Sequence, residues 1–239
     1  MHKKSMILRT HVGILLFRLL LLAMAVVLFF ADNVLMDFTT INAFSGEAVF
    51  TGNTFFLWLV WLHLLGGMVL RIFPNKIITL GARKHFLHPG TGAQHKTVDK
   101  EKLHRGALYS FLGWFVCTAA SVAVLHFLSI LSPPIVLIIA LVYAVLDSLF
   151  ILFFCPFQAL FMKNHCCTTC RIYNWDYLMM CAPLMLFPSF FSASLVILSL
   201  AVFIQWEWAL RKNPAKFSPE TNPDLTCKNC NDKLCKLRR

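Results

Sequence analysis

Cysteine and histidine residues are concentrated around two short polar segments of this chain, KNHCCTTC and TCKNCNDKLC. The candidate metal ligands in and near these segments are Cys155, His165, Cys166, Cys167, Cys170, Cys227, Cys230 and Cys235. Each segment contains a C-x-x-C pair, whose two-residue gap lets both sulfurs reach one ion from a turn. Two such pairs indicate a metal site more strongly than one, because a single pair also serves thiol redox chemistry.

The identity of the metal depends on how many thiolates it uses. A tetrahedral zinc site would take the four cysteines of the two C-x-x-C pairs and would join the two segments. That site leaves Cys155, Cys166 and Cys235 without a role. The full set of thiolates, together with His165, is large enough for two centres or for one centre with alternate ligands. We therefore favour an iron–sulfur cluster over Zn²⁺, and we keep free or redox-active thiols as the third interpretation.

Four ionisable side chains lie inside long apolar runs: Arg18, His63, His126 and Asp147. Such residues are costly in a membrane and usually face a partner or a cavity. Arg18 and Asp147 fall at overlapping depths, so we expect an ion pair, which would serve either packing or a proton or ion path. The two histidines raise the question of a haem, but their depths differ, which favours hydrogen-bonded core residues.

The composition identifies the elements that must hold these residues. The chain is 58% hydrophobic and only 14% charged, whereas soluble domains are about a quarter charged. The chain has 239 residues. Its first apolar run continues to Met36, so the run is too long to be the core of a cleavable signal peptide. We expect an all-α, polytopic membrane protein whose first span is not removed.

Six transmembrane helices account for the apolar runs. The predicted spans are 12–36, 50–73, 107–131, 135–161, 172–186 and 189–210. The last apolar stretch is too long for one span, so we divide it at Phe187-Pro188-Ser189 into a short hairpin. The predicted bundle covers residues 1–210, with a basic loop at 74–106 and a Cys-rich tail at 211–239. Prolines at the start of the tail predict an extended connector.

The basic residues predict the orientation of the bundle. There are 22 Lys and Arg against 11 Asp and Glu, and the loops after the first and third spans contain no Lys or Arg. By the positive-inside rule both termini, the basic loop and both Cys-rich segments are cytoplasmic, which requires an even number of spans. Trp175, Tyr177, Trp206 and Trp208 are expected to be anchors at one membrane interface. Since the cytosol is reducing, structural disulfides are not expected.

The partners expected from this pattern are lipids and membrane proteins. The basic loop would meet anionic lipid headgroups, and no nucleic acid is expected because the apolar runs leave no soluble domain. Gly90–Thr97 resembles a phosphate-binding loop but lacks its second glycine and its α/β context. We therefore favour a flexible basic turn over a nucleotide-binding loop at this position.

Three functions remain open from the sequence. The first is a cell-membrane protein with a cytoplasmic Cys-ligated metal centre that passes electrons to or from a membrane redox partner. The second is a transporter or an assembly subunit in which zinc only fastens the tail to the loop. The third is a membrane thiol oxidoreductase that uses one of the C-x-x-C pairs. The sequence assigns no catalytic residue and does not decide whether the protein is an enzyme.

Overall fold

The computed structural model describes residues 2–31, 36–41, 54–73, 84–85, 100–162, 170–218 and 221–226. Every regular element in these ranges is helical, which confirms the predicted all-α class. In chain order the elements are α1 (His2–Ala31), η2 (Phe38–Thr40), α2 (Phe55–Ile72), α4 (Lys100–Phe127), α5 (Pro133–Leu152), η4 (Phe157–Met162), η6 (Tyr173–Trp175), α6 (Asp176–Cys181), η7 (Ala182–Leu186), α7 (Phe190–Lys212), η8 (Pro214–Phe217) and η9 (Pro223–Leu225).

Five of these helices are long and apolar enough to cross a membrane. They cover Ile7–Ala31, Phe55–Ile72, His104–Phe127, Pro133–Leu152 and Phe190–Lys212. They overlap the first four predicted spans and the sixth. The fifth predicted span, at 172–186, instead forms the short elements η6, α6 and η7 in succession. Pro183 lies in η7, where it has no N–H to continue an α-helix.

The fourth span was predicted to run from 135 to 161, and this prediction is wrong at its end. The helix stops at Leu152, and a π-helical turn from Phe157 to Met162 follows. Pro156 explains the break, because it lacks an N–H and its ring would clash with the carbonyl of Leu152. Cys155 therefore lies in a non-helical link rather than within a span.

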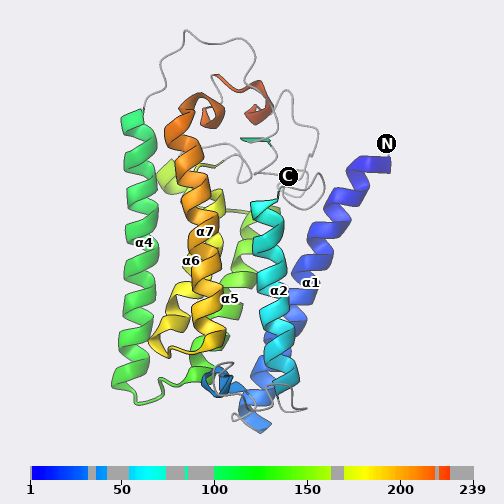
Figure 1. Cartoon of the computed structure of the whole chain (residues 1–239), viewed down its shortest axis with the longest axis vertical. Helices are drawn as coiled ribbons and strands as arrows, with labels where there is room; N and C mark the ends of the chain where they lie inside the picture. The colour runs from blue at the N-terminus through cyan, green and yellow to red at the C-terminus, as the bar shows by residue number, and fades with distance from the viewer. Residues whose placement is uncertain are drawn as a thin grey trace.

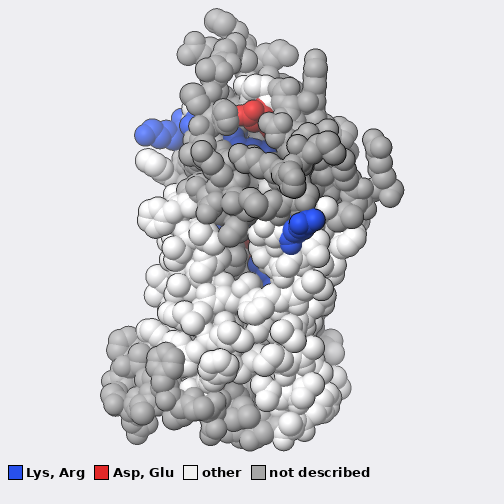
Figure 2. All heavy atoms as spheres, turned by 90° about the vertical axis from the view of Figure 1, so that its right-hand side faces the viewer, with Lys and Arg blue, Asp and Glu red and all other residues white. Residues whose placement is uncertain are grey.

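The helices stand side by side as an antiparallel bundle (Figure 1). The start of α1, the end of α2, the start of α4, the end of α5 and the end of α7 lie at one end, which we call the basic end. The opposite end, which we call the far end, contains the described residues 28–31, 36–41, 54–58, 122–136 and 185–193. These far-end residues include no Lys or Arg. From the α1 side, the charged side chains that are visible among the described residues lie in the upper and middle parts of the molecule (Figure 2).

The segment from η6 to η7 runs beside α7 from the basic end towards the far end (Figure 1). The chain then turns at Ser189, which caps α7 in a reciprocal capping box with Ser192. Two of the three short elements are 3-10 turns, which rise about 2 Å per residue and so cover more distance than an α-helix of the same length.

The core is formed mainly by α1, α2, α5, α6 and α7, and α4 lies at its edge. Half of the apolar window of α5 is buried inside the molecule, against 11% for α4. Along α4, large apolar side chains such as Phe115 and Val116 remain more than half exposed. In a membrane, such a helix face meets lipid.

Candidate functional site

Arg18 is the centre of a buried polar cluster at mid-bundle. Its Nη1 donates to Asp147 Oδ2 and to the carbonyl of Ala144, each at 2.7 Å. The same nitrogen donates to Ser148 Oγ at 2.8 Å, and Nε donates to His63 Nε2 at 3.3 Å. The expected ion pair between Arg18 and Asp147 is therefore present, and it joins α1 to α5.

The second ion pair joins α2 to the broken segment. Arg71 Nη2 donates to Asp176 Oδ2 at 2.6 Å, and Nη1 donates to the carbonyl of Tyr173 and to Asn174 Oδ1. Its guanidinium lies 4.2 Å from the centroid of the Tyr173 ring and also faces the Tyr177 ring. Because Arg71 fills five interactions at once, it fixes the start of the segment against the basic end of α2.

The third ion pair joins the residue after Cys170 to α7. Arg171 Nη2 donates to Glu207 Oε2 at 2.7 Å, and Trp175 Nε1 donates to Glu207 Oε1 at 2.9 Å. Trp206 Nε1 donates to the carbonyl of Arg171. Both oxygens of Glu207 thus bind the segment that follows the first Cys-rich stretch.

The start of the tail is folded against the same part of α7. Phe217 packs edge-on against Trp206, and His85 contacts both rings, stacked on Phe217 with a centroid distance of 4.5 Å. Asn222 Nδ2 donates to the carbonyls of Lys84 and Lys216. The tail therefore begins as two 3-10 turns, η8 and η9, and not as the extended connector that its prolines predicted.

His85 is fully buried in this cluster, which we call the Trp206 cluster: Trp206, Phe217, His85 and Asn222. Burial, with a smaller contribution from nearby Lys84, lowers the pKa of His85 to about 3. The ring is therefore neutral, and since Nδ1 lies 3.1 Å from the carbonyl of Lys216, we assign the proton to Nδ1. The predicted basic loop was expected to be a solvated basic face, and this is wrong for Lys84 and His85, which are both buried.

The described part of the predicted metal site is small. Cys155 and Cys170 are buried and line one cavity. The remaining candidate ligands, which are His165, Cys166, Cys167, Cys227, Cys230 and Cys235, lie outside the described residues, as does Gly90–Thr97. Among the described residues, no group of three or more His, Cys, Asp or Glu side chains is arranged to hold a metal ion.

Two cavities lie between α4 and the rest of the bundle. One, of about 500 Å³, lies between α4, α6 and α7 and is lined in part by Arg105, Arg171 and Phe203. The other, of about 410 Å³, lies between α4, α5, η4 and α6 and includes Asp147 and Asp176 in its wall. Trp114 borders both. The ion pairs of the bundle interior thus reach a cavity beside the outermost helix.

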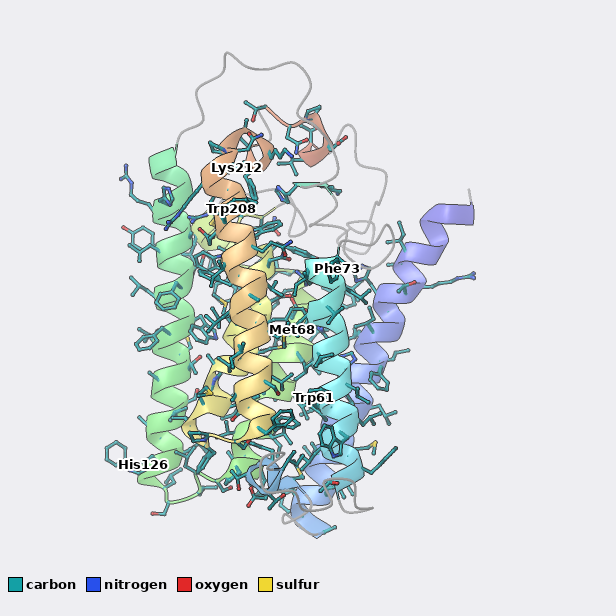
Figure 3. All side chains as sticks on the ribbon, in the orientation of Figure 1. Trp61, Met68, Phe73, His126, Trp208 and Lys212 are labelled. Atoms are coloured by element: carbon teal, nitrogen blue, oxygen red, sulfur yellow. The ribbon has the colours of Figure 1, made fainter. Side chains whose placement is uncertain are left out.

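The two histidines considered for haem lie on different parts of the bundle. His63 is on α2 and accepts the hydrogen bond from Arg18. His126 is at the far end of α4, on the opposite side of the bundle from α2 (Figure 3). The described side chains therefore do not bring these two imidazoles together.

Several roles were missed or wrongly assigned from the sequence. Asp176 and Glu207 were not singled out, and Arg71 and Arg171 were treated as loop charges although both are buried. Of the four predicted interface anchors, only Trp208 is exposed; Trp175, Tyr177 and Trp206 are buried. The signal that would have suggested these pairs is a basic residue near the end of one apolar run and an acidic residue near the end of another.

Two other cysteines complete the comparison. Cys181 is fully buried in the core, as expected for a small apolar side chain. Cys117 was expected to be buried as well, but it is exposed on α4 and lines the cavity of about 410 Å³. The peripheral position of α4 is the reason for this difference.

Comparison with protein-family models, with curated proteins and with solved structures finds no match for the chain. The fold and the side chains therefore define a class only: an α-helical protein with five helices long and apolar enough to span a membrane, three buried ion pairs among its described residues, and two Cys-rich segments in its sequence. Its function has to be argued from the arrangement of these features.

Proposed function

We propose that the protein is a six-span membrane protein that holds a Cys-ligated metal centre at its basic end. The centre, for which we favour an iron–sulfur cluster, would exchange electrons with a partner in the membrane. The basic end would face the cytoplasm, where thiolates remain reduced and available as ligands. Both termini, the basic loop and both Cys-rich segments would then share that side.

The distribution of charge supports this orientation. The far-end residues lack Lys and Arg, whereas Arg9, Arg105, Arg211 and Lys212 lie near the basic end. Cytoplasmic segments of membrane proteins carry this excess. The course of η6, α6 and η7 beside α7 supports a sixth crossing, which the buried pair of Arg71 and Asp176 would make tolerable in a bilayer.

The observation that carries the proposal is that both Cys-rich segments adjoin the Trp206 cluster. Cys170 ends the first segment, and the carbonyl of the next residue, Arg171, accepts from Trp206. On the other side, Phe217 packs on Trp206, and Asn222 holds the turn that ends at Thr226, directly before Cys227. Two stretches that are far apart in the sequence are thereby anchored on one indole ring.

This anchoring favours a site shared by the loop and the tail over two separate sites. A metal that bridges two segments binds more favourably when their ends are already held close. Otherwise the conformational entropy lost in ordering both segments opposes binding. The buried Cys155 and Cys170 would stand on the bundle side of such a centre. Thiolates from both segments would then enclose it.

Metal analysis of the purified protein tests the proposal. The full chain is purified anaerobically in detergent, its visible spectrum is recorded, and iron, zinc and acid-labile sulfide are assayed. Iron with sulfide and a broad visible absorbance is the expected result. Stoichiometric zinc in a colourless protein would refute electron transfer and indicate a structural zinc site instead. A metal-free protein with titratable thiols would refute the metal centre and leave thiol redox chemistry.

Matched variants show whether the two segments share the site. The double substitution Cys227→Ser and Cys230→Ser should remove the metal, as should Cys167→Ser with Cys170→Ser. Cys117→Ser, on the exposed face of α4, should leave the metal content unchanged. If each double variant kept half of the metal, two independent sites would replace the shared one.

A reporter fused after Arg239 tests the orientation. We expect a cytoplasmic reading, and a second reporter inserted in the turn after Leu131 should read the opposite side. A reading of the Arg239 fusion on the side opposite the cytoplasm would refute both the six-span count and the shared site.

A further inference from the structure

The cavity of about 410 Å³ beside α4 has the size of a small-molecule site, since such sites typically measure about 300–1,000 Å³. It lies between helices that can span a membrane, so a ligand would reach it from the bilayer. Its wall is almost entirely apolar. All of its lining residues belong to the described part of the chain, and Cys155 and Cys170 are among them.

Aromatic rings from four elements line this cavity. They are Trp114 on α4, Tyr143 and Phe150 on α5, Phe157 and Phe161 on η4, and Tyr173 on η6. Aromatic walls favour a flat ring in an offset or edge-on arrangement over a bare alkyl chain. The neighbouring thioethers of Met179 and Met180 add polarisable contacts to a ring of this kind.

The charges around the cavity cancel. Arg18 pairs with Asp147, and Arg71 pairs with Asp176. A charged ligand would therefore enter a low-dielectric site without a counter-charge, which is unfavourable. The occupant should be uncharged.

One carboxylate oxygen is left for a ligand. Asp176 uses Oδ2 for Arg71 and Oδ1 for the backbone N–H of Tyr177. Asp147 uses Oδ2 for Arg18, whereas its Oδ1 accepts no hydrogen bond from the described part of the chain. Its side chain is 15% exposed and belongs to the cavity wall. A hydroxyl group of a ligand would donate to this oxygen.

A hydrogen-bond donor lies on α4 at the same level along the bundle as Asp147. Thr118 and Tyr143 are joined by a hydrogen bond of 2.8 Å between α4 and α5. Trp114 is one helical turn from Thr118 towards the basic end, and Asp147 is one turn from Tyr143 in the same direction. The indole N–H of Trp114 has no acceptor among the described residues. An oxygen of the ligand would supply one.

We propose that this cavity binds an isoprenoid quinol. The flat, uncharged ring would pack among the aromatic side chains, one ring hydroxyl would donate to Asp147 Oδ1, and a ring oxygen would accept from Trp114. The apolar tail would leave along α4 into the lipid. The ring would bind through Asp147 and Trp114, which are not candidate metal ligands, although Cys155 and Cys170 also line the cavity.

Equilibrium binding of decyl-benzoquinol tests the proposal. The full chain is titrated anaerobically in detergent, with the dimethyl ether of the same quinol as the matched probe that lacks hydroxyl donors. We expect the quinol to bind about tenfold more tightly than its ether, because a buried acceptor loses its partner in the ether. Equal affinities would reduce the site to an apolar pocket and overturn the proposal.

A pair of substitutions on α4 tests the location. Cys117→Phe fills the cavity, whereas Ala119→Phe adds the same ring on an exposed part of α4 that does not line it. Quinol affinity should fall at least about tenfold in the first variant and stay unchanged in the second. Unchanged affinity in Cys117→Phe would place the ligand elsewhere. If that variant fails to fold, the comparison of quinol and ether on the unaltered chain still decides the question.

Discussion

The two ends of the bundle are held together by different chemistry. From mid-bundle to the basic end, three Arg–carboxylate pairs join α1 to α5, α2 to α6, and the residue after Cys170 to α7. At the far end the contacts are aromatic, as in the stacking of Phe38 on Phe191 and of Trp61 on Phe190. Aromatic contacts occur at both ends, as in the Trp206 cluster, but the three ion pairs do not extend to the far end.

The difference shows where specificity is needed. Lipid tails are as apolar as leucine, so apolar packing alone does not fix the register of helices in a membrane. A buried ion pair fixes it, because removal of one partner leaves an uncompensated charge. The paired residues lie from mid-bundle towards the basic end, where Cys170 and the start of the tail are anchored.

The largest effect is expected from breaking the ion pair at mid-bundle. Asp147→Leu leaves Arg18 buried at 4% exposure without its counter-charge, and should lower the free energy of unfolding by about 3–5 kcal/mol. The double variant Arg18→Met and Asp147→Leu should recover most of this loss, since an apolar pair of similar volume is often neutral. Unfolding in mixed SDS and detergent micelles measures both. A double variant less stable than the single one would contradict the expectation.

Adjacent glycines on α2 provide the next comparison. A Cβ on Gly67 would collide with the hydroxyl of Tyr177, whereas a Cβ on Gly66 would meet no atom within 4 Å. Gly67→Ala should therefore destabilise the protein by about 1–3 kcal/mol. Gly66→Ala should be neutral or stabilise by up to about 1 kcal/mol through helix propensity. Equal thermal unfolding temperatures for the two variants would show that the Tyr177 contact does not fix the broken segment.

The Trp206 cluster should loosen in acid. Because the pKa of His85 is about 3 in the folded state and about 6.5 when exposed, the undocked state binds the extra proton between these values. Docking is therefore fully stable above about pH 6.5 and is weakened as the pH falls, by about 2 kcal/mol at pH 5. Proteolysis of the tail should accelerate over this range.

His85→Phe is the control for that prediction, since it keeps a flat ring against both Trp206 and Phe217 but cannot take up a proton. Its rate of proteolysis should vary little between pH 7.5 and pH 5 once the intrinsic pH dependence of the protease is subtracted. A similar acceleration in this variant would assign the effect to other groups, such as Lys84 or the tail itself.

The smallest effects are expected at the far end. Ser189→Ala removes the cap of α7 and should cost about 1 kcal/mol. Ser194→Ala removes the acceptor of the Trp61 indole N–H, which is 2.9 Å away, and should cost a similar amount or less. Chemical unfolding of both variants against Asp147→Leu tests the contrast directly. A loss above about 3 kcal/mol in either serine variant would mean that the far end is not the weaker one.

The sequence correctly predicted the features that depend on the average hydropathy of a segment and on depth in the membrane. Hydropathy and length locate the five long helices, and equal depth in the membrane predicts the pair of Arg18 and Asp147. These inferences succeed because each follows from the distance of a residue from the end of a helix. They need no knowledge of which helices are neighbours.

The rest depends on which helices are neighbours. Counting Arg71 and Arg171 as loop charges treats them as solvated, but each reaches a carboxylate on an element that only the fold brings near. The burial of Trp206 follows in the same way from the return of the tail over α7. Pro156 is enough to predict that α5 ends at Leu152. The predicted span of 135–161 was too long and continued the helix past this proline.

The order of the three ion pairs along the chain has a consequence for synthesis. In every pair the arginine is made before its carboxylate: Arg18 precedes Asp147 by 129 residues, and Arg71 precedes Asp176 by 105. At about 5–20 residues per second, α1 waits roughly 6–26 s for its counter-charge. During that time His63, which follows Arg18 by only 45 residues, is the one of its described side-chain partners already made, so contact with α2 precedes contact with α5 in the order of synthesis.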